Sequence, residues 1–307
     1  YLAGANITTG NNNVCIGNNA GDAITTANYC TAVGRKALSS NVTSSNCTAV
    51  GYECLEDNTG TDNTAVGYLA ANKNTSGYNN TAMGDRALRD NTTASGNAAF
   101  GRYALRDNNT DNNAAFGYLS FQSSTGGGNT GCGYVSGGQA TTGENNTFLG
   151  NAAGYTTTTG SNNSAIGKHA WSSSASASNE ITLGDGNISS LRCADTSISS
   201  LSDRRDKTDI VDLPVGLDFI NSVRPVKFKW QTREGLPAKD GLIRAGFIAQ
   251  ELQEAQTGSE YLDLVLDSNP DKLEAKQSKL IPVLVKAVQE LSAENTALKS
   301  RLDAAGL

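Results

Sequence analysis

A four-residue pattern recurs along the chain up to residue 184, and it limits what this region can fold into. The pattern reads small, small, apolar, Gly, as in TAVG at residues 64–67, and successive glycines stand 16 or 17 residues apart. A fixed period identifies a repeat protein, and a unit this short fits one or two short strands with turns rather than a pair of helices. The sequence therefore predicts a β-solenoid whose turns stack about 4.8 Å apart. The glycines of the pattern are Gly17, Gly34, Gly51, Gly67, Gly84, Gly101, Gly117, Gly133, Gly150, Gly167 and Gly184.

Aligning the turns on this glycine sorts the other residues into files. The residue just before the Gly is apolar in every turn, and we expect this apolar file to fill the solenoid interior. The position four before the Gly is Asn in most turns, which predicts a ladder of side-chain amides between stacked turns. The position three after it is Ala or another small residue, as expected where space is tight. The apolar file is Ile16, Val33, Val50, Val66, Met83, Phe100, Phe116, Cys132, Leu149, Ile166 and Leu183, and the Asn file is Asn13, Asn63, Asn80, Asn97, Asn113, Asn129, Asn146 and Asn163.

The composition of this region indicates that it does not fold alone. Residues 1–190 are rich in Asn, Thr, Gly, Ala and Ser, and each turn brings only one or two apolar side chains. Such a tract stays ordered only if stacking and association bury enough surface to offset the entropy of the backbone. We therefore expect a rod on the order of 50 Å long that associates with further copies of itself. An obligate homotrimer is favoured over a monomer, although the files alone do not fix the number three.

The repeat resembles the head repeats of trimeric autotransporter adhesins. The turn N-N-S-A-I-G at residues 162–167 carries the likeness, since the adhesin turns have an N-S-x-A-I-G pattern. The resemblance implies a mainly β fold, a parallel β-roll associated threefold, for residues 1–190. The turns here are longer than is common in those adhesins.

Charge and residue usage exclude several other functions. The formal net charge of −6 provides no basic surface for phosphates, so we expect no nucleic-acid partner. No run of about 18 apolar residues and no signal-type leader are present, so we expect no membrane insertion. The six cysteines lack C-x-x-C spacing and His169 is the only histidine, so we expect neither a metal site nor a cofactor. Cys30 and Cys47 share the Asn file in adjacent turns, where two free thiols are favoured over a disulfide, and His169 is favoured as a surface residue.

The character of the sequence changes near residue 200, where charged residues and prolines become frequent. Four motifs follow in order: L-S-D-R-R-D-K-T-D-I from residue 201, L-D-F-I-N-S-V-R-P-V-K-F-K-W from 217, A-G-F-I-A-Q-E-L from 245 and K-L-I-P-V-L-V-K-A-V-Q-E-L from 279. They resemble the intramolecular chaperone of phage tail spikes and fibres, the S74 peptidase family. The resemblance implies a small α+β domain at 202–307, after a linker at 191–201, that assembles the trimer and then cuts the Leu201–Ser202 bond. It makes Ser202 the nucleophile and Lys207 its basic partner, within a motif that includes Asp203.

The proposed pair also has a chemical rationale that is independent of the family. A serine hydroxyl needs an adjacent base, and a lysine amine can serve once it is neutral. Neutral lysine requires burial or nearby positive charge, because the ordinary pKa of lysine is about 10.4. Arg204 and Arg205 are candidates to supply that charge, whereas Asp206 opposes it and departs from the family, which more often has an apolar residue there. The alternative is that Ser202 caps a charged helix start and that Lys207 is merely solvated.

The end of the chain predicts a long helix at about 278–303, with Pro282 in its first turn. Leu284, Leu291 and Leu298 are seven residues apart, which is typical of a three-stranded coiled coil. We expect Leu280 and Ala287 in the alternate seam, together with Glu294, which weakens it. The alternative is that this stripe packs on its own domain.

These features favour the distal part of a viral tail fibre or spike, located in the virion, whose released chaperone stays in the host cytoplasm. The stalk is then a candidate to touch a host glycan or protein. One alternative is a cellular trimeric adhesin or structural fibre with an uncleaved trimerisation domain. A glycan-degrading spike would need a cleft with paired carboxylates, and Glu53 and Glu56 lie on turns instead. The candidate saccharide-stacking residues, which more simply cover the rod, are Tyr52, Tyr68, Tyr118 and Tyr134.

Overall fold

The computed structural model describes residues 2–188, 190–194, 198–231 and 241–306, so that residues 195–197 of the predicted linker lie outside the described part. The chain divides into two compact units, residues 1–188 and residues 189–307. The first unit is a parallel β-solenoid, and the second is a small α/β region that ends in a long helix. The mainly β fold expected from the repeat is confirmed.

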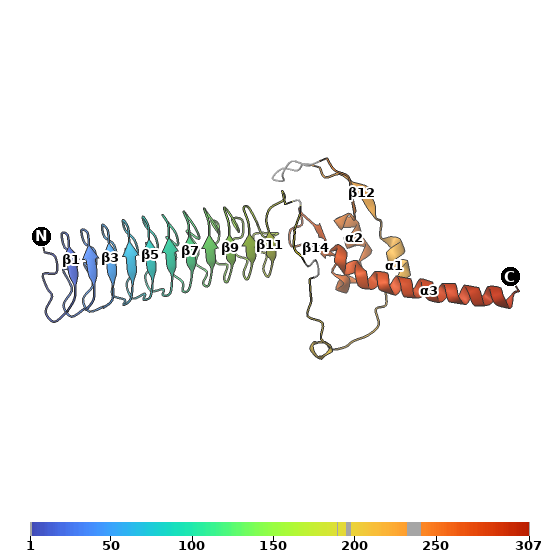
Figure 1. Ribbon diagram of the computed structural model, residues 1–307, viewed down its shortest axis with the longest axis horizontal. Coiled ribbons are helices and arrows are strands. Elements are labelled where there is room, and N and C mark those ends of the chain that lie inside the picture. Colours follow the sequence, from blue (N-terminus) through green and yellow to red (C-terminus); the bar gives the residue numbers. More distant parts are fainter. Residues whose placement is uncertain (1, 189, 195–197, 232–240, 307) are drawn as a thin grey trace. The chain divides into compact units, whose positions relative to one another are not determined.

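Each turn of the first unit contributes one three-residue strand, and the strands form a single parallel sheet in sequence order (Figure 1). Pairing follows the repeat, so that Ala32 lies opposite Ala49 and Val33 opposite Val50. Each strand is therefore the three residues that precede the repeat glycine. The strands are β1 Val14–Ile16, β2 Thr31–Val33, β3 Thr48–Val50, β4 Thr64–Val66, β5 Thr81–Met83, β6 Ala98–Phe100, β7 Ala114–Phe116, β8 Thr130–Cys132, β9 Thr147–Leu149, β10 Ser164–Ile166 and β11 Ile181–Leu183.

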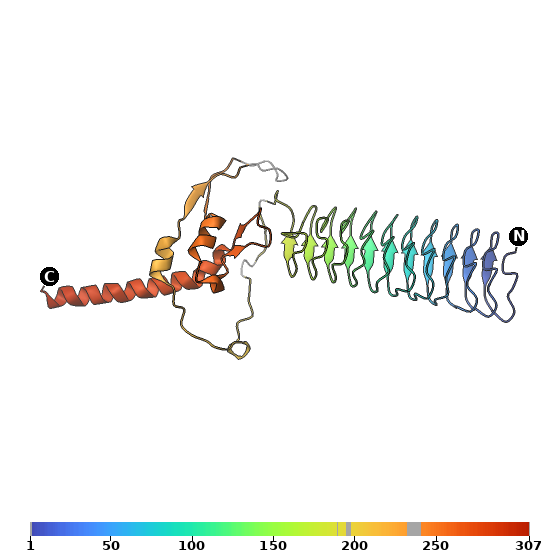
Figure 2. The same cartoon turned by 180° about the vertical axis from the view of Figure 1, so that it is seen from behind.

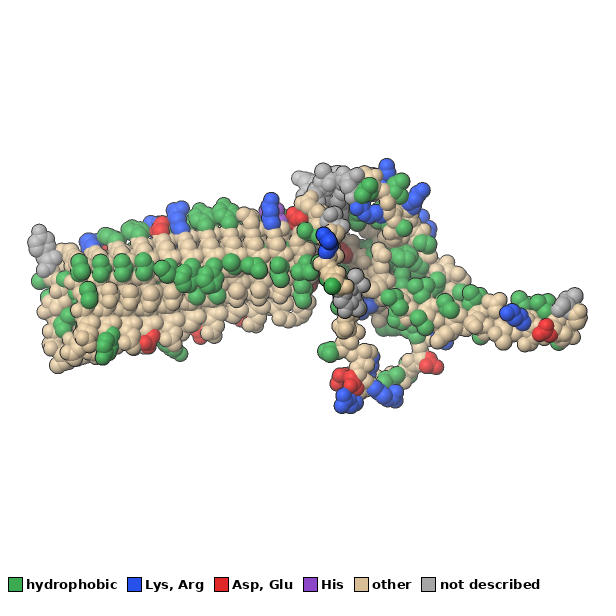
Figure 3. Space-filling model, in the orientation of Figure 1, with side chains coloured by type: hydrophobic (Ala, Val, Ile, Leu, Met, Phe, Trp, Pro, Cys, Tyr) green, Lys and Arg blue, Asp and Glu red, His purple; other side chains and the backbone are tan. Residues whose placement is uncertain are grey.

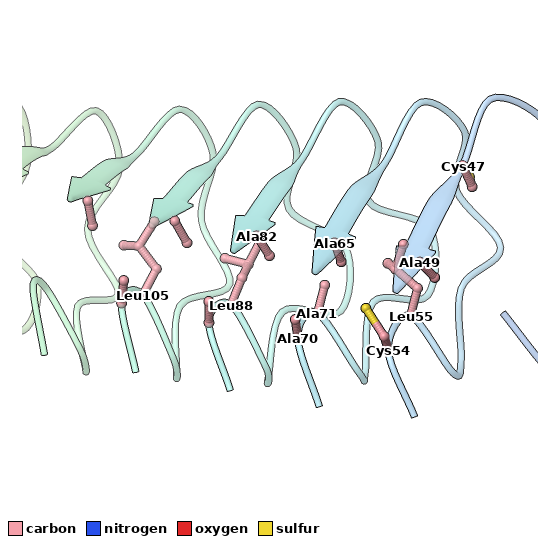
Figure 4. Close-up of a cluster of buried hydrophobic side chains, with 14 of the residues drawn as sticks. Cys47, Ala49, Cys54, Leu55, Ala65, Ala70, Ala71, Ala82, Leu88 and Leu105 are labelled. Carbon is pink, nitrogen blue, oxygen red and sulfur yellow. The ribbon is translucent and has the colours of Figure 1, made fainter. Parts of the chain in front are cut away.

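The interior of the solenoid is filled by small side chains from the strands and by leucines from the opposite wall (Figure 4). Ala49 and Ala82, at the middle of their strands, are fully buried, as are Leu55 and Leu88, which lie four residues after the glycine. The apolar file before the glycine is not in the interior, and that expectation is wrong. Successive strand residues point to opposite faces of a sheet, so burying the middle alanine turns its neighbours outward.

The repeat glycine is required by the stacking of one turn on the next. Gly51 has a φ of +143°, and a Cβ placed on it would lie 2.2 Å from the carbonyl oxygen of Gly67. Any side chain would therefore collide with the backbone of the adjacent turn while forcing an unfavourable φ. The neighbouring file glycines repeat this close approach.

Two files of buried asparagine join the turns. The predicted Asn file is confirmed, but its amides bond to backbone: Asn80 Oδ1 accepts from the Asn97 N–H at 3.0 Å, and Asn80 Nδ2 donates to the Ala94 carbonyl at 2.8 Å. A second file, seven residues after the glycine, makes the amide-to-amide ladder, since Asn91 Nδ2 donates to Asn74 Oδ1 at 2.7 Å. The sequence signal for this second file is Asn at 41, 58, 74, 91 and 108, which the three files expected from the repeat do not include.

The second unit is built from short elements and one long helix around an apolar core. Leu252, Leu264 and Val283 are buried at its centre. The helix α1 lies beside α3 in both views, and the Leu217 N–H donates to Glu290 Oε2 at 2.7 Å between them (Figure 2). The elements are η1 Arg204–Asp206, α1 Leu217–Ser222, β12 Val226–Phe228 antiparallel to β13 Arg244–Gly246, α2 Ala249–Ala255, η2 Glu260–Leu262, β14 Val265–Leu266 antiparallel to β15 Glu274–Ala275, η3 Gln277–Leu280 and α3 Ile281–Ala304.

Candidate functional site

A short turn near the start of the second unit, in the motif that begins at residue 201, brings Ser202 and Lys207 together. Asp203 caps η1, and its Oδ1 accepts a hydrogen bond from the Arg205 N–H at 2.8 Å. The turn lets Lys207 reach back, so that its Nζ donates to Ser202 Oγ at 2.6 Å. A serine hydroxyl and an amine at this distance are within reach for proton transfer once the amine is neutral.

The charges around this pair are arranged differently from the sequence expectation. The Arg205 guanidinium lies against the Asp203 carboxylate, with Nε 3.1 Å from Oδ1, and this bond lowers the pKa of Asp203. The positive charge of Arg205 is thereby compensated locally by Asp203. Arg204 and Asp206, the other two residues of η1, are exposed.

The Ser202–Lys207 pair is open to solvent in a single chain. Every residue from 201 to 210 is exposed, and Leu201 is 99% exposed. A lysine acts as a base only when its charged form is disfavoured by desolvation or by positive neighbours. The exposure of residues 201–210 means that one chain, where it is described, does not desolvate this lysine. A reactive pair therefore requires cover from another surface.

Other candidate chemistry is absent from the parts that the structure describes. Within these ranges, no three His, Cys, Asp or Glu side chains gather as metal ligands would, and no helix is long and apolar enough to cross a membrane. Glu53 and Glu56 both form ion pairs with Lys36, whose Nζ is 3.7 Å from Glu53 Oε1 and 2.8 Å from Glu56 Oε1.

The tyrosines of the stalk stack on each other. Tyr52 and Tyr68 have ring centroids 5.3 Å apart, and the guanidiniums of Arg35 and Arg86 lie 5.1 and 4.9 Å from the centroids of these two rings. Tyr118 and Tyr134 stack in the same way at 5.4 Å. The faces of the first pair are thus engaged within the chain, which supports the simpler interpretation that these rings cover the rod.

The contacts of three further residues, Cys30, Cys47 and His169, are within the stalk itself. The two thiols are buried and free. Their mutual hydrogen bond lowers the pKa of Cys30 to about 7 and, together with burial, raises the pKa of Cys47. His169 lies beside the Trp171 ring, with the ring centroids 5.5 Å apart.

The outward apolar file forms a continuous surface along the first unit, which we call the sheet stripe. In the space-filling view, hydrophobic side chains run in a row over the strands (Figure 3). Ile16 is 60% exposed and Leu149 47% exposed, which is unusual for large apolar residues repeated in a line. None of the file members is charged. The sheet stripe comprises Ile16, Val33, Val50, Val66, Met83, Phe100, Phe116, Cys132, Leu149, Ile166 and Leu183.

A second exposed apolar line follows α3, and we call it the coil seam. Leu284 and Leu291 are 46% and 47% exposed, so the predicted leucine stripe does not pack on its own domain. The predicted alternate seam is wrong, since Leu280 and Ala287 are both 4% exposed in a single chain, and Leu280 packs in the core of the second unit. The coil seam comprises Ile281, Leu284, Val288, Leu291, Asn295, Leu298 and Leu302.

The comparison with protein families matches part of the second unit. Residues 202–261 match the family described as chaperone of endosialidase, Peptidase_S74, and Ser202 is the first residue matched. This segment is therefore similar to the chaperone of that family. A β-solenoid followed by such a segment has the organisation of a tail fibre or tail spike with a carboxy-terminal chaperone. Comparisons with curated proteins and with solved structures give no match.

Proposed function

We propose that this chain is the distal part of a viral tail fibre or spike that folds as a homotrimer and then releases its own chaperone. The proposed chaperone is residues 202–307, which brings three chains together and lets the stalk, residues 1–190, fold upward from that end. The observation that carries the proposal is the family match beginning at Ser202, together with the 2.6 Å contact between Lys207 Nζ and Ser202 Oγ.

Two exposed apolar surfaces support self-association. The sheet stripe spans all eleven strands and the coil seam spans α3, and both repeat regularly along the chain. Association of copies in register would place equivalent apolar residues against each other in every layer. Closed rotational symmetry, here threefold, lets each copy bury both surfaces without leaving an open end.

The proposed cleavage is an acyl shift followed by hydrolysis. Neutral Lys207 accepts the proton of Ser202 Oγ, and the oxygen attacks the carbonyl carbon of Leu201. The peptide C–N bond breaks, the amine of Ser202 takes a proton, and Leu201 is left as an ester on Oγ. Water then opens the ester, which yields the Leu201 carboxylate and restores the serine hydroxyl. Each chain reacts once.

The exposure of the pair supports coupling between assembly and cleavage. Because Ser202 and Lys207 are solvated in one chain, the desolvation that a lysine base needs has to come from neighbouring chains. Only an assembled trimer would then cut itself. Loss of the chaperone leaves three interlocked stalks without a refolding template, so that their resistance is set by an unfolding rate.

The proposed product belongs to the virion, and the released chaperone remains in the host cytoplasm. The stalk then presents its surface to a glycan or protein of the host cell. The regular loops between strands are the surface available for this contact, since the sheet stripe is committed to assembly.

Denaturing electrophoresis of the purified protein tests the cleavage. The expected result is two bands, of roughly 200 and 106 residues, which merge into one in Ser202→Ala. Ser200→Ala is the matched control, because Ser200 is an exposed serine of the same segment, and it is expected to cleave normally. A full-length band in the wild type would reject the peptidase and leave an uncleaved trimerisation domain.

A further inference from the structure

The distal half of α3 has no cover within its own unit. Every residue from 291 to 306 is exposed, in contrast to the first turns, where Val283 is fully buried and Ala287 is 4% exposed. An isolated helical segment of this length is marginally stable in water. Its order therefore indicates a partner that covers it, and the coil seam shows which face the partner covers.

The coil seam has an unbroken heptad register. Apolar residues alternate at spacings of three and four, which places Ile281, Val288 and Leu302 at the a positions and the three leucines at d. The a position between Val288 and Leu302 is Asn295. A single polar a residue costs stability and fixes the register of the helices, because a shifted partner would set its amide against an apolar side chain.

Two charges flank the polar layer. In this register Glu294 occupies a g position and Lys299 the following e position. Both are exposed, and in the described part of the chain neither takes part in an ion pair. In a parallel coil, a g residue of one helix faces the next e residue of its neighbour. Glu294 of one copy would thus meet Lys299 of another in every interface of the assembly.

We propose that α3 pairs with the same helix of other copies in a parallel, in-register coil, selected by the Asn295 layer and by Glu294–Lys299 pairs between chains. The occupant of the coil seam is a second copy of this chain, because Glu294 and Lys299, which flank the seam, are opposite in charge and face each other when two copies lie parallel and in register. The number of copies, three, rests on the proposed function. The seam supplies the registration that the stalk needs before its turns stack.

Charge reversal in the full-length, uncleavable Ser202→Ala protein tests this pairing. Glu294→Lys and Lys299→Glu each place like charges in every interface, and the combined variant restores opposite charges with the signs exchanged. With about a twofold effect for each of three pairs, each single reversal is expected to lower the yield of oligomer about eightfold. The combined variant is expected to recover it.

Co-expression provides a second measurement that does not depend on yield. Differently tagged Glu294→Lys and Lys299→Glu chains have complementary interfaces, so they are expected to form mixed oligomers in excess of the proportion found for two tagged wild-type chains. Asp303→Lys is the matched control, because it makes the same charge change at an exposed position of α3 outside the seam.

The outcomes separate this inference from the proposed function. Random mixing, or single reversals that assemble like Asp303→Lys, would overturn the proposed pairing while the oligomer itself remained. A wild-type chain that is monomeric would instead reject the proposed function. The variant Asn295→Leu provides an independent test. We expect its oligomer to melt at a higher temperature and to lose its uniform size. An oligomer of unchanged, uniform size would contradict the role of Asn295.

Discussion

Phe121 and Phe148 stack inside the solenoid with ring centroids 5.5 Å apart and an interplanar angle of 15°. The turn between them has Gly131 and Gly137 at the two positions where other turns have a strand alanine and a wall leucine. A Cβ on Gly137 would lie 2.5 Å from the Phe121 ring. The turn that contains Gly131 and Gly137 has no side chains at these two core positions, and the rings of Phe121 and Phe148 in the adjacent turns fill the space instead.

Gly154→Ala tests this exchange. Its Cβ would lie 2.3 Å from the Phe148 ring, and its φ of +61° disfavours alanine. We expect a loss of about 2–4 kcal/mol in stability, combining overpacking with the backbone cost. Thermal unfolding measures it, with Gly127→Ala as the control, because the nearest atom to that Cβ is a carbonyl oxygen 3.2 Å away. Equal melting temperatures for the two variants would argue against a filled core.

A second substitution at this pair of positions, Phe148 and Gly154, should restore stability that a first one removes. Phe148→Ala alone should cost about 3–5 kcal/mol through the cavity that it opens. Adding Gly154→Leu recreates the alanine and leucine pair of Ala49 and Leu55 and should restore much of that loss. If the double variant is no more stable than Phe148→Ala, the two positions do not share one volume.

The sheet stripe is open to a charge test. Leu149→Asp adds a carboxylate to a residue that is 47% exposed in a single chain, where a surface substitution costs little. If the stripe is buried in the assembly, an unpaired charge there costs several kcal/mol per copy and the soluble oligomer is lost. Thr142→Asp, at an exposed position of the same turn, should assemble normally, as size-exclusion chromatography would show. Assembly of both variants would rule out the stripe as an interface.

Thiol labelling measures whether the sheet stripe is accessible to solvent in the protein without substitutions. Cys132 and Cys193 are both exposed in one chain, but only Cys132 lies in the sheet stripe. We expect a maleimide to label Cys193 rapidly in the native protein and Cys132 only after denaturation. Peptide mass spectrometry distinguishes the two sites. Rapid native labelling of Cys132 would mean that the stripe is uncovered.

Asn80→Ala tests the Asn file. The side chain is 1% exposed and accepts a hydrogen bond from the Asn97 N–H, so its removal leaves that buried donor unpaired, whereas the Ala94 carbonyl keeps its hydrogen bond from Asn91 Nδ2 at 3.0 Å. The expected loss is about 1–3 kcal/mol, seen as a lower unfolding temperature. Thr75→Ala is the comparison, because the exposed Thr75 hydroxyl bonds one carbonyl at the surface and should cost under about 1 kcal/mol.

The sequence was sufficient to predict the repeat, its short strands with turns and the Asn file, because each depends on residue types that recur at a fixed spacing. It was insufficient for the direction in which the strands face. Val50 is more hydrophobic than Ala49, yet Ala49 is inside, since the narrow interior admits only a small strand residue opposite Leu55. Leu55 itself adopts a left-handed φ of +49°, which leucine rarely does and which only the stacked neighbours explain.

The site was predictable to a similar degree. The contact between Lys207 and Ser202 was expected from the motif. The ion pair between Arg205 and Asp203 was not expected, because it depends on the conformation of the local turn. Two coil registers share Leu284 and Leu291, and periodicity alone does not choose between them. Ala287 is 4% exposed in a single chain, and this burial, which is a tertiary property, favours the register that we propose for the coil seam.

The mass in solution of the full-length Ser202→Ala protein tests the central claim, self-association of this chain, most directly. Sedimentation equilibrium or native mass spectrometry should give three copies of 31.9 kDa, about 96 kDa, with no folded single chains at micromolar concentration. A stable, folded species of 31.9 kDa would contradict the account, because it would show that the sheet stripe and the coil seam need no partner.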